Sequence, residues 1–152
     1  MTIRHMTGSI FDSGADAIVI PTNTVGVQGA GLAKQAAKRW PAWSRAYAAA
    51  CKRGDAVPGS IWYHRADTIW IVALATKDHW RDPSRIEWVE YGLHDLVNSV
   101  GLYRIASVAI PALGCGLGGL RWEYVRPRIE RAAEQVQWLD VLVYPPQDHN
   151  RR

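Results

Sequence analysis

Six consecutive residues, Thr-Lys-Asp-His-Trp-Arg at positions 76–81, bring together side chains suited to acid–base or nucleophilic chemistry. A lysine beside an apolar cleft loses its proton readily and can then act as a nucleophile or a base. Lys77 is such a candidate, and His79 is a second titratable group. Each also has a plainer interpretation, Lys77 as a solvated surface charge and His79 as a rim residue bonded to the backbone. The segment therefore predicts a candidate catalytic lysine and leaves the plainer alternative open.

A second chemistry, the binding of phosphate, is suggested by a cluster of glycines. Positions 114, 116, 118 and 119 are all glycine, between an apolar run that ends at Pro111 and a helical pattern that starts at Trp122. Without a Cβ, backbone N–H groups can approach a phosphate closely, and the start of the following helix adds partial positive charge. The alternative is a tight turn from strand to helix. Cys115, inside this loop, is expected to be a small buried thiol rather than a nucleophile.

Residues 22–31 form another glycine-rich stretch after an apolar run. Asn23 in this stretch has an amide that can both donate to and accept from a sugar hydroxyl. Asparagine also commonly caps its own turn. The residue type alone leaves both roles open.

The elements that must position these residues are predicted to alternate between strands and helices. Asp82 and Pro83 are predicted as the N-cap and the first residue of the third helix. The predicted strands are 2–6, 17–20, 60–64, 68–74, 105–110 and 138–144, and the other predicted helices are 32–40, 43–52 and 122–136. Several strands are apolar throughout, which favours an α/β fold with a mainly parallel sheet covered on both faces. Since ligands bind at the carboxyl ends of such strands, the three loops are expected to share one site.

The composition of the whole chain limits the classes of protein. At 152 residues the chain is expected to be one domain over 1–145 with a polar tail at 146–152. The net charge of +4 suits an anionic partner such as a nucleotide or nucleic acid. No apolar run is long enough to span a membrane, no signal peptide is recognisable, and the two cysteines have no metal-ligand spacing. We expect a cytoplasmic monomer that uses no metal.

Three motifs, taken together, carry a resemblance to a known family. They are Asn23-Thr-Val-Gly-Val27, the Thr-Lys-Asp-His-Trp-Arg segment at 76–81, and Ile110-Pro-Ala-Leu-Gly-Cys-Gly-Leu-Gly-Gly-Leu-Arg-Trp122. In this order the chain resembles the macrodomain family, whose members bind ADP-ribose, and within it the DarG subgroup of antitoxins. The resemblance covers roughly positions 3–144. It implies a three-layer α/β/α fold with a mixed, mostly parallel central sheet.

The resemblance also implies roles for individual residues. Two residues are implied to be catalytic: Lys77 matches the family's catalytic lysine, and Asn23 matches the asparagine beside the distal ribose. Residues 114–119 match the pyrophosphate loop. The implied ligand-binding residues are Ser9, Ile10, Thr24, Val25, Gly29, Gly31, Leu32, Leu113, Gly114, Cys115, Gly116, Leu117, Gly118 and Gly119. Apart from the resemblance, the stacking and phosphate-binding chemistry of His79, Trp80, Arg81 and Arg85 suggests a rim for single-stranded DNA.

The implied activity is removal of ADP-ribose from thymidine bases of single-stranded DNA, the modification that a DarT-type toxin makes from NAD. ADP-ribose is then the ligand and product, and no cofactor is needed. Ser9 stands where the family usually has an aspartate that binds adenine. Gly118 stands where a related macrodomain has an aspartate that works with its lysine, which argues against a two-residue Lys–Asp mechanism.

Three other functions remain compatible with the sequence. One is a non-catalytic reader of ADP-ribose, in which Lys77 has no chemical role. Another is an enzyme that removes ADP-ribose from protein carboxylates. The third is a partner-binding module with a degenerate pocket.

Overall fold

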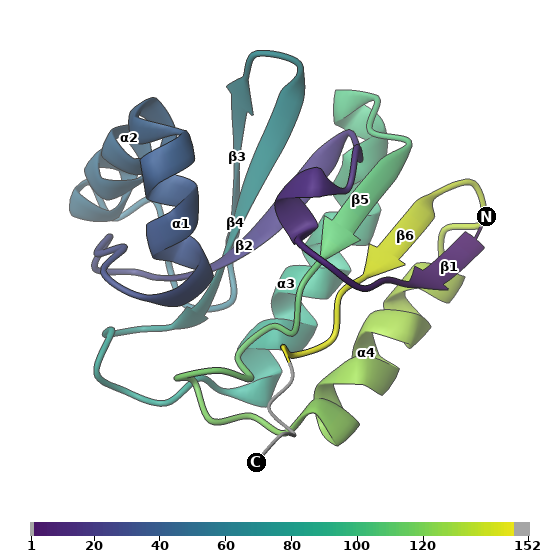
Figure 1. Cartoon of the computed structure of the whole chain (residues 1–152). Coiled ribbons are helices and arrows are strands. Elements are labelled where there is room, and N and C mark those ends of the chain that lie inside the picture. The colour runs from purple at the N-terminus through teal and green to yellow at the C-terminus, as the bar shows by residue number, and fades with distance from the viewer. Residues whose placement is uncertain (1, 148–152) are drawn as a thin grey trace.

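Residues 2–147, the part of the chain that the computed structural model describes, form a six-stranded sheet between two pairs of helices (Figure 1). The sheet order is β1-β6-β5-β2-β4-β3, and every neighbouring pair is parallel except the β3–β4 hairpin. The strands are β1 (Thr2–His5), β2 (Ala17–Asn23), β3 (Ile61–Ala66), β4 (Ile69–Lys77), β5 (Ser107–Ile110) and β6 (Asp140–Val143). The helices are α1 (Gly31–Arg39), α2 (Pro41–Lys52), α3 (Ile86–Ser99) and α4 (Trp122–Glu134), with short 3₁₀ turns at Ile10–Asp12 and Val100–Tyr103. The predicted three-layer arrangement with a mixed, mostly parallel sheet is confirmed.

Alternating side chains on the central strands build one core on each face of the sheet. In β2, Ala17 and Val19 pack with α3 and α4, whereas Ile18 and Ile20 pack with α1 and α2. All four are at most 1% exposed. Full burial of a valine or isoleucine side chain contributes about 1.5–3 kcal/mol. The strand ends that carry the loops are therefore held on a rigid support.

Two strands extend further than the sequence predicts. We expected β2 to end at Pro21, but it continues to Asn23 and pairs with β4 along its whole length. β2 pairs with β5 only as far as Ile18. Pro21, which has no N–H to donate, therefore interrupts no hydrogen bond between these two strands. β4 continues to Lys77 rather than ending at residue 74. Both candidate catalytic residues therefore lie on strand ends and not on free loops.

The third helix starts later than its capping signal predicts. It begins at Ile86, and its N-cap, Arg85, has no side-chain cap. The Ser84 N–H instead donates to the Gly118 carbonyl at 3.0 Å, and the Arg85 N–H donates to the Thr76 carbonyl at 3.3 Å. These long-range bonds hold the segment extended and outweigh the local Asp-Pro capping signal. Among residues 2–147 no helix is both long enough and apolar enough to cross a membrane.

Candidate active site

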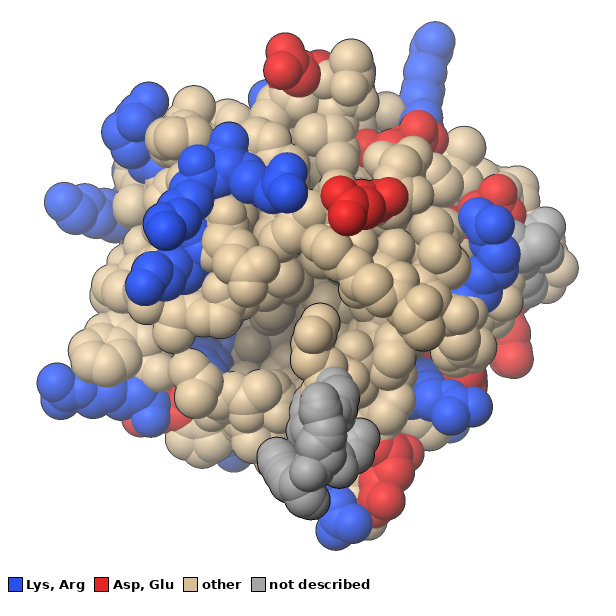
Figure 2. All heavy atoms as spheres, in the orientation of Figure 1, with Lys and Arg blue, Asp and Glu red and all other residues tan. Residues whose placement is uncertain are grey.

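A cavity of about 1150 Å³ opens at the carboxyl ends of the parallel strands. It is visible as a hollow near the centre of the face in Figure 2. The loops after β2, β4 and β5 all contribute to its lining, as the topology predicts. The sequence-predicted residues that line it are Ser9, Ile10, Asn23, Gly29, Gly31, Leu32, Lys77, Trp80, Gly114, Gly116, Leu117 and Gly118.

Asn23 and Lys77 are brought together by strand pairing. They are register partners at the ends of β2 and β4, where an irregularity between Thr22 and Asn23 shifts the register. The Lys77 side chain is half-buried, and its Nζ donates to the Trp80 carbonyl at 3.2 Å. The strand pairing thus places the two residues side by side in the lining of the cavity.

The Asn23 amide organises the loop that follows it. Its Oδ1 accepts from the N–H groups of Val25 at 3.1 Å, Gly26 at 2.8 Å and Val27 at 3.3 Å. Its Nδ2 donates to the Val27 carbonyl at 2.9 Å, and the residue is only 7% exposed. Of the two roles that the sequence left open for Asn23, the structure therefore shows the second: Asn23 caps its own turn. An amide nitrogen carries two hydrogens, so the second remains for a ligand in the cavity.

A buried tyrosine supports the backbone at this point. The Tyr47 hydroxyl donates to the Asn23 carbonyl and accepts from the Thr22 hydroxyl, both at 2.9 Å. Burial raises the pKa of Tyr47 far above its ordinary value, so this hydroxyl keeps its proton. The position of Asn23 is consequently fixed from the backbone side as well as through its own amide.

Three residues of the glycine loop that line the cavity have backbone N–H groups without an acceptor in the described part of the chain. Within it, the N–H groups of Cys115, Gly119 and Leu120 donate to carbonyls of the same loop or of Ala112. Among residues 2–147, the N–H groups at positions 116, 117 and 118 have no such acceptor, and these three residues line the cavity. Successive free N–H groups form an anion-binding concavity, which is the chemistry predicted for this loop.

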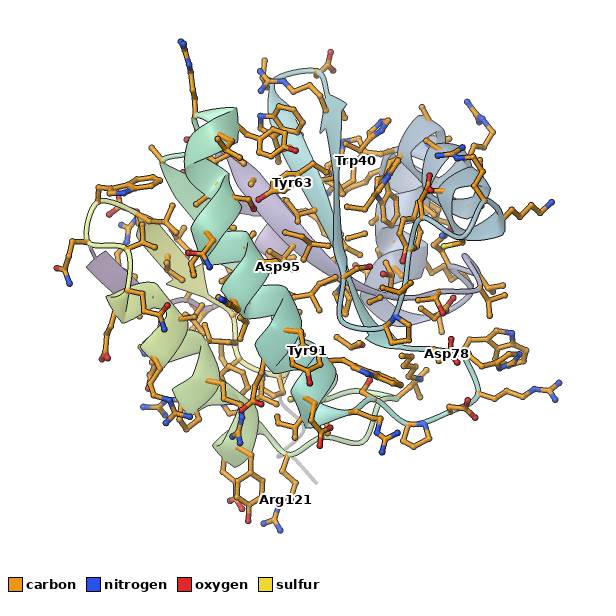
Figure 3. All side chains as sticks on the ribbon, turned by 180° about the vertical axis from the view of Figure 1, so that it is seen from behind. Trp40, Tyr63, Asp78, Tyr91, Asp95 and Arg121 are labelled. Atoms are coloured by element: carbon orange, nitrogen blue, oxygen red, sulfur yellow. The ribbon has the colours of Figure 1, made fainter. Side chains whose placement is uncertain are left out.

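The start of α4 does not take part in this lining. Arg121, its N-cap, lies at the outer surface (Figure 3) and forms an ion pair with Glu123 at 2.7 Å. Contrary to expectation, the N-terminus of α4 contributes no residue to the cavity lining. An anion in the cavity would therefore be bound by the glycine loop.

Gly118 has no room for a side chain. A Cβ there would collide with the Ser84 hydroxyl and lie 2.5 Å from the Gly114 carbonyl oxygen. Ser84 is buried, and its hydroxyl donates to the Thr76 hydroxyl at 3.2 Å. The chain thus excludes an aspartate at position 118 unless the loop moves. Sequence reasoning missed Ser84, because its role depends on contacts with Thr76 and with the distant glycine loop.

Five predicted ligand-binding residues do not line the cavity. Leu113 is fully buried in the core between the sheet and the helices α3 and α4. Thr24 is turned toward Asp78 (labelled in Figure 3), whose carbonyl and carboxylate both accept from its hydroxyl. Burial raises the pKa of the Cys115 thiol to about 11, in line with an unreactive thiol. The other two are Val25, which is exposed, and Gly119, which lies in a turn with φ of 82°.

Other lining residues were not identified from the sequence. Phe11 and the nearly buried Tyr144 supply aromatic surface, and Tyr144 follows β6, another parallel strand that ends at the same edge. Pro146 and Gln147, which the sequence reading assigned to a polar tail, also line the cavity. Residues 148–152 of that tail lie outside the described part of the chain. Ligands bind at the carboxyl ends of parallel strands, and the same rule applied to the predicted strand 138–144 would have pointed to these residues.

Three of the suggested rim residues form one cluster beside the cavity. The Arg81 guanidinium lies 4.6 Å from the centre of the Trp80 ring, and the Arg81 N–H donates to His79 Nδ1 at 3.1 Å. Trp80 is 42% exposed and lines the cavity. Arg85 does not join the cluster, because its guanidinium lies over Trp88 of α3.

Comparisons with known proteins agree on one family. Residues 19–129 match the sequence model of the Macro domain. A curated DNA ADP-ribosyl glycohydrolase of Thermus aquaticus is 42% identical over 148 residues, which cover 95% of this chain and 41% of that protein. The chain therefore spans about two fifths of that relative's length.

Two solved structures are closely similar. The macrodomain of Mycobacterium tuberculosis DarG superposes with a TM-score of 0.91 at 38% identity, covering 96% of this chain and 99% of that one. The structure of Thermosipho africanus DarTG in complex with ADP-ribose gives a TM-score of 0.89 at 30% identity, covering 95% of this chain and 42% of that one.

Proposed function

This chain belongs to the macro domain family, and on that premise we propose that it hydrolyses the bond between ADP-ribose and thymidine bases of single-stranded DNA. The observation that carries the proposal is the pairing of Asn23 with Lys77 in the lining of a cavity that is also lined by a loop with free N–H groups. The T. aquaticus relative is named as an enzyme of this activity, and the T. africanus structure holds ADP-ribose.

The cavity suits the size and charge of ADP-ribose. At about 1150 Å³ it is slightly larger than the usual small-molecule site of about 300–1,000 Å³, which leaves room for a dinucleotide-sized ligand. The free N–H groups at positions 116–118 would bind the pyrophosphate, and the aromatic surfaces of Phe11 and Tyr144 offer apolar contact to the adenine. The Ser9 oxygen already accepts from the Phe11 N–H at 3.2 Å, which leaves the hydroxyl one further acceptor position.

The proposed reaction breaks the bond between the anomeric carbon of the distal ribose and a nitrogen of the base. Water supplies a hydroxyl group to that carbon and a proton to the departing base. Asn23 orients a ribose hydroxyl through its free Nδ2 hydrogen, and Lys77 acts on the anomeric centre. In one route its amine adds to the anomeric carbon as the bond to the base breaks, and the resulting glycosylamine opens to an imine, the same imine that the ring-opened aldehyde would give; water then hydrolyses this intermediate to free the lysine and ADP-ribose. In the other route the protonated amine gives its proton to the leaving base while water attacks the carbon. No cofactor enters this scheme, and fixed positioning by the loops supplies part of the rate.

The setting proposed for this activity follows from its substrate. A DarT-type ADP-ribosyltransferase would supply the modified DNA, as the name DarTG of the T. africanus relative suggests. We further propose that the reaction takes place in the cytoplasm and that the protein acts as a monomer.

The test uses a thymidine-containing single-stranded oligonucleotide that has been ADP-ribosylated beforehand. The wild type should release ADP-ribose, whereas Lys77→Ala should lose at least about a hundredfold in rate, the scale of a general acid or base. Calorimetry should show that Lys77→Ala still binds free ADP-ribose. Lys77→Arg is the matched control, since it keeps a positive charge and a donor for the Trp80 carbonyl but cannot form an imine. Full activity in Lys77→Ala would refute the role of this lysine.

Borohydride reduction separates the two roles of the amine. If Lys77 attacks the anomeric centre, borohydride reduces the imine during turnover and traps a covalent protein adduct that Lys77→Ala cannot form. If Lys77 is an acid, no adduct forms while release proceeds. Binding of ADP-ribose without release by the wild type would instead indicate a reader or an enzyme for another linkage.

A further inference from the structure

We infer that the exposed basic face of α1 and α2 binds the phosphates of the DNA strand on either side of the modified base. The inference rests on the proposed function for the identity of the polyanion. The face consists of five exposed side chains, Lys34, Lys38, Arg39, Arg45 and Lys52. Figure 2 shows lysine and arginine side chains gathered over these two helices, beside the hollow.

The positive charge of this face is not balanced locally. From residue 17 to residue 54 the chain contains no aspartate or glutamate. None of the five side chains forms an ion pair with another residue in the described range 2–147. An unpaired group of cations on adjacent helices attracts a polyanion more strongly than scattered charges do.

The α4 side of the molecule provides the contrast. There Arg126 pairs with Glu130 at 3.0 Å, and Arg128 pairs with Glu90 at 2.7 Å. Because carboxylates accompany these arginines, the α4 surface carries little net charge. The basic face is therefore a property of one side of the molecule and not of its overall composition.

The basic face continues from the cavity wall. Leu32, Ala33 and Gln35 of α1 line the cavity, and Lys34 lies between them on the exposed side of the same turn. The Arg39 guanidinium lies 4.6 Å from the ring centre of Phe11, another lining residue. A strand that delivers its modified base into the cavity would pass over these cations.

The loop that carries Trp80 and Arg81 is bonded to the loop that leads into the basic face. The loop that carries Trp80 is joined to the loop that leads into α1 by Thr24, whose N–H donates to the Asp78 carbonyl at 3.0 Å. Trp80 offers a surface on which a base next to the modified one can stack. The cations of α1 and α2 then bind phosphates further along the strand.

The test compares two variants that each remove four positive charges, which takes the net charge from +4 to zero. The first is Lys34→Gln/Lys38→Gln/Arg45→Gln/Lys52→Gln, in which Arg39 is kept because it touches Phe11. The control is Arg4→Gln/Arg121→Gln/Arg126→Gln/Arg131→Gln, all exposed residues away from α1 and α2. All substituted side chains are exposed, so thermal melting should show both variants folded.

The first readout is binding of an unmodified oligonucleotide by fluorescence anisotropy at several salt concentrations. Each neutralised phosphate contributes about 0.7 to the slope of log K against log salt for a single strand, so the first variant should lose up to about 3 in slope. The control should keep the wild-type slope. Equal losses in the two variants, or no loss in either, would overturn the inference.

The second readout is the release of ADP-ribose from two substrates. The first variant should raise KM about tenfold on a long modified oligonucleotide and leave KM unchanged on an ADP-ribosylated thymidine nucleoside. A rise on both substrates would place the defect in the cavity and overturn the inference. If the wild type releases nothing from either substrate but binds the oligonucleotide through the basic face, the proposed function fails while the inference stands.

Discussion

The substitution Gly118→Ala tests whether the shape of the glycine loop depends on a side chain being absent at one position. The added Cβ would meet the Ser84 hydroxyl, the Ser84 Cβ at 2.8 Å and the Gly114 carbonyl oxygen at 2.5 Å. Atoms this close must separate. Ser84 cannot simply rotate away, since it is buried and bonded to Thr76. We therefore expect the loop to move.

The size of the effect follows from the cost of overpacking. Inserting a methyl group into a packed site costs about 1–3 kcal/mol. For a chain of this length each kcal/mol lowers Tm by about 2–4 °C, so the expected fall is about 2–12 °C. Displacement of the loop should also misalign at least one N–H group from the pyrophosphate. A bond to a charged group is worth about 1.5–3 kcal/mol, which predicts affinity for ADP-ribose weaker by about tenfold to a hundredfold.

The assays are thermal melting of the free protein and calorimetric titration with ADP-ribose. Gly116→Ala is the control for melting, because a Cβ at position 116 meets nothing within 4 Å. Adding Ser84→Gly to Gly118→Ala should recover part of the lost Tm, which a double-mutant cycle measures. The reasoning is refuted if Gly118→Ala melts and binds like the wild type, or if Gly116→Ala melts as low as Gly118→Ala.

Two further predictions concern Asn23 and Cys115. Asn23→Ala should lower Tm by several degrees, because it leaves three loop N–H groups without their acceptor. Asn23→Asp keeps that acceptor and should melt at a higher temperature than Asn23→Ala. Equal Tm values for the two variants would contradict the capping role. In a Cys51→Ser background, Cys115 should react slowly with iodoacetamide at pH 8 and faster as the pH approaches its pKa of about 11. Folding raises the pKa of the Cys115 thiol from 9.0 to about 11. The contribution of this thiol to the free energy of unfolding is therefore fully present below pH 9 and is lost as the pH rises through about 11. Alkylation at pH 8 as fast as that of a free thiol would show that the thiol is not shielded.

Much of the fold could be predicted because its signals are local. The run 17–20 is apolar at every position, and the structure buries each of these residues on one face or the other of the sheet. The apolar spacing of the third helix likewise matches its buried residues, which include Val89, Leu93 and Leu96. Periodicity therefore identified the elements and the order of the layers.

The boundaries next to the site could not be predicted, because distant segments decide them. Asp82-Pro83 is a good local start signal for a helix, yet Ser84 and Arg85 bond to Gly118 and Thr76 instead. Pro21 is a good local stop signal, yet β4 continues to pair with β2 beyond it. In both places a backbone hydrogen bond to a residue far away in the sequence outweighs the local preference.

By itself, the sequence determined the residue types of the site, namely the amine of Lys77, the amide of Asn23 and the loop glycines, and the parallel order that gathers their loops at one edge. Only the tertiary structure decided how they are used. It pairs Asn23 with Lys77 and fills the space at Gly118 with Ser84. It also closes the cavity with the segment after β6. These features arise from contacts between segments that are far apart in the chain, and periodicity and local propensity contain no information about such contacts.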